Sequence, residues 1–241
     1  MRQYIVAVPL SMVVATVACW VPDKPYVPPG PFDCHNVVPT TASDPVTING
    51  VVQIALSGQG LAGAVVELFR SGYQVQRITT PAADPLHHID AGSFSFQLAT
   101  VGRPTEVYLR ITDNDGGYLP ILYYPAESVT QNITINPQML DMTIAQYVGM
   151  GMNVTFDFMN KVQFLIGVVD CQENQLGGAK VTVSPPGPDP VHYFIDDKGP
   201  KPDKDASETD SATGVAVAAN LLPQVVTVGA TVVSPKDGSI L

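Results

Sequence analysis

The alternation of apolar and polar positions along the chain predicts β-strands joined by tight turns. Residues 50–68, GVVQIALSGQGLAGAVVEL, place two runs of apolar and β-branched residues on either side of a glycine-rich turn. Such residues suit a pleated, half-buried surface, and glycine adopts the positive φ angles that turns require. We therefore expect an antiparallel β-hairpin here.

A shorter copy of this hairpin returns at residues 167–183, GVVDCQENQLGGAKVTV. The correspondence continues downstream, where 90–96 matches 211–217 and 106–111 matches 225–232. The paired stretches lie about 115 to 122 positions apart, a spacing that suits two small domains in tandem better than a solenoid. We interpret the chain as an internal duplication.

Further alternating stretches predict the other strands. Short strands are expected at 118–124, 131–135 and 191–195, and residues 153–158 alternate in the same way. The last strands are expected at 215–222 and 225–233. Methionines gather between the two copies, and we expect them to pack in a core, although a methionine-rich surface can also be an adaptable binding face.

The order of these motifs resembles the carboxypeptidase regulatory-like domain. The shared pattern is G-x-V, a polar turn, L-x-G-A-x-V and then a strand that starts after glycine, over 46–136 and 162–241. The resemblance implies an all-β protein with two tandem prealbumin-like or immunoglobulin-like sandwiches of about seven strands each. It also implies accessory modules that are not themselves peptidases. We place the domains at 45–137 and 138–241, the second with an acidic insert.

The N-terminus is typical of a secretion signal over residues 1–18. Arg2 is the only early charge, and the apolar run at 4–18 is shorter than the roughly 20 residues that a membrane span needs. Residues 15–18 precede Cys19 in a pattern that resembles the bacterial lipobox, with Thr16 where leucine is usual. We expect lipidation at Cys19; plain signal cleavage and a retained anchor stay open.

A proline-rich segment at 19–44 follows and is expected to be an extended tether. A disordered leader without purpose is the other interpretation. Two further cysteines, Cys34 and Cys171, form an even pair that suits an oxidising compartment. They could form a disulfide, and two free thiols are the alternative.

Composition limits the classes of function. The 241 residues include 22 prolines and 20 glycines with 45% hydrophobic residues, which allows two small cores with many turns. The formal net charge of -10 argues against a nucleic-acid partner, whose phosphates would repel the chain. No nucleophile elbow, zinc-protease motif or phosphate-binding loop is present in the sequence. We therefore expect no enzyme activity and no cofactor.

Two groups of residues are candidate metal ligands. Asp113, Asn114 and Asp115 bring oxygen atoms to a glycine-rich turn that could hold calcium, but the glutamate that completes a calcium loop is absent. Such residues also stabilise turns without a metal. The second group, a possible zinc site, comprises His87, His88 and Asp90 with His35 or His192. Adjacent histidines on an extended segment point to opposite sides, so a solvated pair is the simpler interpretation.

Three functions from different classes fit this sequence. The first is a lipid-anchored protein of the bacterial envelope that displays the loops 79–89 and 196–210 for structural, adhesive or protein-binding roles. The second is carbohydrate binding by exposed tyrosines, in either an anchored or a secreted protein. The third is an accessory subunit of a separate enzyme or transporter. The candidate sugar-stacking residues are Tyr73, Tyr108, Tyr118, Tyr123, Tyr124 and Tyr193.

Overall fold

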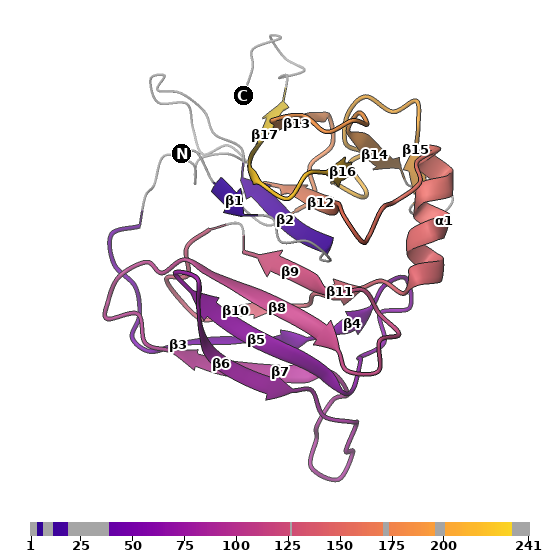
Figure 1. Cartoon of the computed structure of the whole chain (residues 1–241). Helices are drawn as coiled ribbons and strands as arrows, with labels where there is room; N and C mark the ends of the chain where they lie inside the picture. The colour runs from indigo at the N-terminus through magenta and orange to yellow at the C-terminus, as the bar shows by residue number, and fades with distance from the viewer. Residues whose placement is uncertain are drawn as a thin grey trace. The chain divides into compact units, whose positions relative to one another are not determined.

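A computed structural model describes residues 4–6, 12–18, 39–125, 127–170, 174–195 and 201–232, the first two stretches as backbone only. The described chain is mostly β-strand with one short helix, so the predicted all-β class is confirmed (Figure 1). It divides into two compact units. The first unit is Pro39–Ile144, and the second unit combines Met1–Val38 with Ala145–Leu241.

The first unit contains a three-stranded sheet and a four-stranded sheet. The three-stranded sheet has the order β10-β3-β7, with β3 antiparallel to β7 and parallel to β10. The four strands β9, β8, β5 and β6 pair antiparallel in that order. Two residues of β4 (Gln53–Ile54) pair with β11 (Gln138–Met139). The other strands are β3 (Val46–Val51), β5 (Ala64–Arg70), β6 (Tyr73–Thr79), β7 (Ser93–Leu98), β8 (Val107–Asp113), β9 (Ile121–Tyr124) and β10 (Ile133–Ile135).

Alternation along the strands builds the core of the first unit. In β7, Phe94, Phe96 and Leu98 are buried while the serine and glutamine between them are not. In β8, Leu109 and Ile111 are buried and the residues between are more exposed. This period of two is the pattern expected of a sheet with one face on the core.

The second unit shares part of this arrangement, but β14 and β15 extend the sheet that contains β16 and β12, whereas in the first unit β6 pairs with β5. One sheet has the order β15-β14-β16-β12-β2, and the other has the order β1-β17-β13. β12 pairs antiparallel with β16 and parallel with β2, and β17 pairs antiparallel with both β13 and β1. The strands are β1 (Tyr4–Val6), β2 (Met12–Ala18), β12 (Val162–Val169), β13 (Ala179–Ser184), β14 (His192–Ile195), β15 (Lys201–Asp203), β16 (Val215–Leu221) and β17 (Val225–Val232).

A buried threonine ties the hairpin of the first unit together. Thr80 is 3% exposed, and its hydroxyl donates to the Leu61 carbonyl at 2.7 Å while accepting the Ala64 N–H at 3.0 Å. The Thr80 N–H donates to the Ala64 carbonyl, and the Gly63 N–H donates to the Thr80 carbonyl. One residue therefore satisfies four backbone groups around the turn.

Thr209 makes the same four hydrogen bonds in the second unit. It is also 3% exposed, and its hydroxyl donates to the Leu176 carbonyl at 2.6 Å and accepts the Ala179 N–H at 3.0 Å. The Thr209 N–H donates to the Ala179 carbonyl, and the Gly178 N–H donates to the Thr209 carbonyl. The two hairpins thus share one pattern of hydrogen bonds around the turn.

Backbone hydrogen bonds also correct the alignment of the two copies. In each unit a valine donates its N–H to the carbonyl of a glycine and accepts an N–H from a leucine. The equivalent pairs are Val52 with Val168, Leu61 with Leu176, and Gly92 with Gly214. The first strand is therefore shifted by one residue from the sequence match, which paired Gly50 with Gly167.

The segment between the two copies contains a helix that the sequence patterns did not predict. α1 (Met142–Met152) begins where the Asp141 carboxylate accepts the Ile144 N–H at 2.7 Å, a typical N-terminal cap. The prediction of a strand at 153–158 was wrong, because none of these residues belongs to a strand. The Val154 N–H instead donates to the Gly149 carbonyl at the end of the helix. No helix among the described residues is long and apolar enough to span a membrane.

The methionines of this segment divide between core and surface. Met139 and Met152 are buried, as expected. Met142, Met150 and Met159 are 43%, 77% and 68% exposed, so the expectation of a shared methionine core was wrong for these three. One helix cannot bury all of its faces, and its buried residues, which include Ala145 and Gly149, form a narrow stripe.

Candidate functional site

The loop between β6 and β7 is the best-defined candidate site of the first unit. We call residues 80–92 the tip loop; it projects from the strands at the bottom of Figure 1 and contains most of the predicted display loop 79–89. Asp84 and Ile89 close it, because each donates its N–H to the carbonyl of the other, at 2.8 and 3.0 Å. The tip is therefore an ordered hairpin-like turn.

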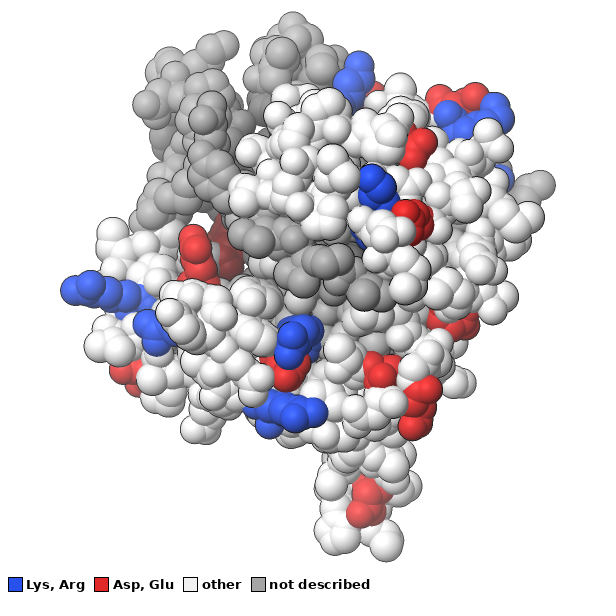
Figure 2. Space-filling model, viewed as in Figure 1, with Lys and Arg blue, Asp and Glu red and all other residues white. Residues whose placement is uncertain are grey.

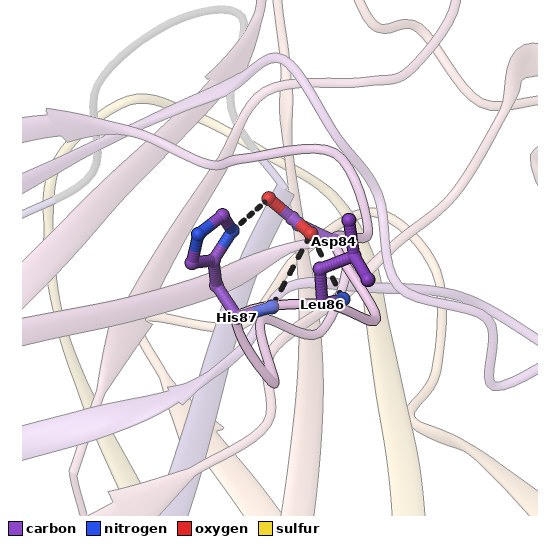
Figure 3. A network of polar contacts seen from close by, with 3 residues as sticks. All are labelled: Asp84, Leu86 and His87. Carbon is purple, nitrogen blue, oxygen red and sulfur yellow. Dashed lines mark hydrogen bonds and ion pairs between the residues drawn. The ribbon is translucent and has the colours of Figure 1, made fainter.

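The Asp84 carboxylate organises the tip (Figure 3). One oxygen, Oδ1, accepts the N–H groups of Leu86 and His87 at 3.0 and 3.3 Å. The other oxygen lies 2.6 Å from Nδ1 of His87. The hydrogen bond from the His87 side chain lowers the pKa of Asp84, with smaller contributions from the two backbone N–H groups and an opposing effect of burial. The tip is thus held in one conformation by a side chain at its base.

This arrangement presents an apolar side chain to solvent. Leu86 is 88% exposed, more than any other large hydrophobic residue described in the first unit. Beside it, the side chain of His87 is 73% exposed and His88 adopts a positive φ of 55°. The hydrogen bonds of Asp84 order the backbone beneath Leu86, which lowers the entropy cost of ordering the loop when Leu86 enters an apolar pocket of a partner.

The structure does not assemble the expected zinc ligands. His87 pairs with Asp84, which was not among them, and the described residues contain no group of three or more His, Cys, Asp or Glu that could hold a metal. His192 belongs to β14 of the second unit, and His35 lies outside the described residues. The Asp84-Pro85 dipeptide is a turn signal that sequence reasoning could have used to find the organising carboxylate.

At the calcium candidate, Asp113 already has partners. Its Oδ1 accepts the Asp115 N–H at 3.2 Å, and its Oδ2 accepts the N–H groups of Gly117 and Tyr118 at 2.7 and 3.3 Å. This is the geometry of a turn-stabilising aspartate. Calcium binding by Asp113, Asn114 and Asp115 stays a prediction.

A row of aromatic rings crosses the four-stranded sheet of the first unit. Tyr108 stacks on Phe69 with ring centroids 4.8 Å apart and planes 7° apart, and on Tyr124 at 5.2 Å. The Arg110 guanidinium lies 5.2 Å from the Phe69 ring centre and donates to Glu67 at 2.6 Å. The faces that these rings turn towards one another are therefore covered and cannot stack on a sugar.

The other candidate tyrosines do not extend this row. Tyr193 is 5% exposed, and its hydroxyl accepts the Val181 N–H at 3.0 Å. Tyr73 is 77% exposed at the start of β6, and Tyr123 pairs with the core residue Leu109. Tyr118 is half-buried after the Asp113 turn. The described tyrosines therefore form no single open platform.

A shallow cavity of about 300 Å³ lies at the end of α1 in the second unit. The residues lining it are Met150, Asn153, Val154 and Thr155. None of these described lining residues carries a carboxylate, imidazole or thiol, so they supply no acid or base for catalysis.

Several predicted residues lie outside the part of the chain that the structure describes. These are Cys19, Cys34, Cys171 and residues 196–200 of the second display loop. Lipidation and a disulfide therefore stay predictions. Within the rest of that loop, Lys201–Asp203 forms β15 against β14, so the expectation of a loop was wrong there. Pro202 is tolerated because β15 is the last strand of its sheet.

Comparison of the chain with known family models and with curated proteins finds no match. The resemblance to the carboxypeptidase regulatory-like domain thus stays a prediction. The tip loop forms the lower projection in Figure 2, and its exposed residues are the best-defined candidate site of the first unit.

Proposed function

We propose that this protein is a non-catalytic, lipid-anchored protein of the bacterial envelope that binds another protein through the tip loop. The observation that carries the proposal is the 88% exposed Leu86 on a turn that Asp84 holds rigid. Binding residues are often found on loops that a scaffold of strands positions, and the tip loop is such a loop between β6 and β7.

Anchoring is supported by the sequence at the N-terminus. An apolar run at 4–18, small residues before Cys19 and a proline-rich segment to residue 44 are the parts of an exported lipoprotein with a spacer. A lipid attached to Cys19 would place the two units at a membrane surface, where a projecting loop can meet a partner in the same plane.

Binding of protein is favoured over binding of sugar by the chemistry of the site. The tip loop offers leucine, isoleucine and imidazole groups, which suit an apolar pocket with a polar rim. The aromatic rings of Phe69, Tyr108 and Tyr124 cover each other. A role as an accessory subunit of another envelope protein is one form of this function.

Two measurements test the proposal. The first is the intact mass of the protein purified from the membrane fraction of its own host. We expect the mature protein to begin at Cys19 and to carry the added mass of acyl chains.

The second measurement places a photo-crosslinking amino acid at position 86. The control places it at position 56, since Leu56 is also 70% exposed in the first unit. We expect one dominant envelope protein to crosslink at position 86 only. Equal crosslinking from both positions would contradict a role for the tip loop.

A further inference from the structure

The first unit completes its three-stranded sheet with a short parallel strand. β10 lies beside β3, with Ile133 opposite Ile48 and Ile135 opposite Gly50. Asparagines hold its two ends, because Asn132 accepts the Thr47 N–H at 2.7 Å and Asn136 accepts the Val51 N–H at 3.0 Å. We call this position beside the first strand of a unit the closing lane.

In the second unit β2 occupies the closing lane. β2 runs parallel to β12, with Val13 opposite Phe164 and Ala15 opposite Ile166. Val168 is equivalent to Val52, so Phe164 and Ile166 are equivalent to Ile48 and Gly50. β2 therefore lies beside the equivalent strand and in the same parallel direction as β10, although it precedes the other strands of its unit in the chain, whereas β10 follows those of the first unit with which it pairs.

β2 also lies within the predicted secretion signal, residues 1–18. If the signal is removed, as the proposed function requires, the closing lane of the second unit loses its strand. We propose that in the mature protein the open edge of β12 binds an extended segment of a partner protein as a parallel strand. Adding a strand to a sheet edge is a common way to recognise a peptide.

The backbone of β12 shows which groups face the lane. The Val168 N–H donates to the Gly214 carbonyl at 2.7 Å, on the side of β16. Successive N–H groups of a strand point to opposite sides, so the N–H groups of Leu165 and Gly167 point into the lane. With β2 gone, these backbone groups would form an unpaired edge, which attracts another strand.

The lane also specifies the middle residue of the incoming strand. In the first unit Thr134 lies opposite Asn49, and its hydroxyl donates to the Asn49 side chain at 2.8 Å. In the second unit the position equivalent to Asn49 is Leu165, and Val14 of β2 lies opposite it. Leu165 is apolar and only partly buried, so an apolar residue opposite it is expected in the middle of the partner strand.

The probe is a fluorescent peptide with the sequence of residues 131–137 carrying Thr134→Val. The protein is expressed with its own N-terminus, purified from the envelope and checked by intact mass. We expect the peptide to bind, and the unchanged peptide with threonine to bind about tenfold more weakly, since its hydroxyl loses a hydrogen-bond partner. The protein variant Leu165→Asn is expected to reverse this preference.

N-methylated peptides supply the matched control. In a parallel ladder the residue opposite Leu165 turns its amide away from β12, and the next residue turns its amide towards it. Methylation of the amide at position 135 is therefore expected to weaken binding about tenfold or more, and methylation at position 134 to weaken it less, because that amide points away from β12.

The outcomes separate this inference from the proposed function. Protein that lacks residues 1–18 but binds no peptide, or binds both methylated peptides equally, overturns the inference alone. A dimer of the mature protein that excludes the peptide also overturns it, because a second copy would then fill the lane. Protein that retains residues 1–18 and binds no peptide overturns both.

Discussion

Thr80 and Thr209 each stabilise one conformation of a glycine-containing hairpin turn through hydrogen bonds of a single side chain. Each hydroxyl donates to a leucine carbonyl and accepts an alanine N–H, and both alanines are fully buried. A buried backbone group without a partner costs about 1 to 3 kcal/mol. These threonines thus stabilise the hairpin by satisfying one buried N–H group and one partly buried carbonyl group each.

Replacing Thr209 with valine keeps its shape and removes the hydroxyl. We expect Thr209→Val to lower the free energy of unfolding by about 2 to 4 kcal/mol, because the Leu176 carbonyl and the Ala179 N–H each lose a partner. Thr209→Ser keeps both hydrogen bonds and should cost less. Urea denaturation of the three proteins measures this, and equal losses for serine and valine would show that the hydroxyl contributes nothing.

His192 is a buried group that responds to acid. It is 6% exposed, and among the described residues its Nε2 has no hydrogen-bond partner. Burial lowers the pKa of His192 below its usual 6.5, and the nearby Asp189 opposes this effect. The unfolded chain therefore binds a proton at a higher pH than the folded protein does.

This difference predicts a loss of stability on acidification. Between pH 6.5 and the lowered pKa of His192, the unfolded state binds more protons, so the free energy of unfolding should fall as the pH falls through this window. His192→Leu removes the titrating group and should make stability less dependent on pH there. Urea midpoints at pH 7.5 and pH 5 test this; an unchanged slope in the variant would exclude His192 as the cause.

At the level of elements, each unit has a glycine directly before β7 or β16, where the backbone passes close to a valine carbonyl. Gly92 has a φ of 79°, and a Cβ atom there would lie 2.5 Å from the Val52 carbonyl oxygen. The equivalent Gly214 has a φ of 57°, and its Cβ would lie 2.7 Å from the Val168 carbonyl oxygen. The positive φ angle and the close approach of the valine carbonyl both require glycine at this position.

Gly58 offers a matched control for this requirement. It also has a positive φ, 67°, but a Cβ there would meet nothing within 4 Å. We expect Gly58→Ala to cost about 1 to 2 kcal/mol from backbone strain alone, and Gly92→Ala to cost at least about 2 kcal/mol more because the backbone must also move. Thermal unfolding of both variants measures the difference. A similar loss of stability in the two variants would show that the space around position 92 does not require glycine.

The hairpins could be predicted from sequence because a buried sheet face imposes a period of two on its residues. α1 could not, because its buried residues Ala145, Gly149 and Met152 form only a narrow stripe and its sequence contains two glycines. Residues 153–158 alternate like a strand but follow the helix end, where Asn153 has a φ of 58°. The one-residue shift at Val168 became clear only from its hydrogen bond to Gly214.

The candidate site was partly visible in the sequence. The loop at 79–89 was recognised by its prolines and its position between strands. The function of Asp84 was not, because a carboxylate that binds backbone N–H groups looks like any other acidic loop residue. Burial of Tyr193 and stacking of Tyr108 on Phe69 depend on contacts between distant strands, which composition cannot reveal.

At the level of the whole molecule, the net charge of -10 favours solubility and does not determine the fold. The predicted lipid on Cys19 would determine where in the cell the protein is found. Cys19→Ser removes the thiol that a lipid requires. We expect this variant to move from the membrane fraction to the soluble fraction of a bacterial host, while Cys34→Ser stays with the membrane. Cell fractionation with immunoblotting measures this, and a membrane-bound Cys19→Ser protein would contradict lipid anchoring at this residue.

The parallel pairing of β3 with β10 also bears on how the first unit folds. The residues that meet there are 85 positions apart in the chain, as Thr134 and Asn49 are. Such non-local pairing slows folding, because the loop must close before the contact is gained. Until β10 pairs with it, the edge of β3 is open to any other extended chain, so association between copies during folding at high concentration is a hazard of this topology.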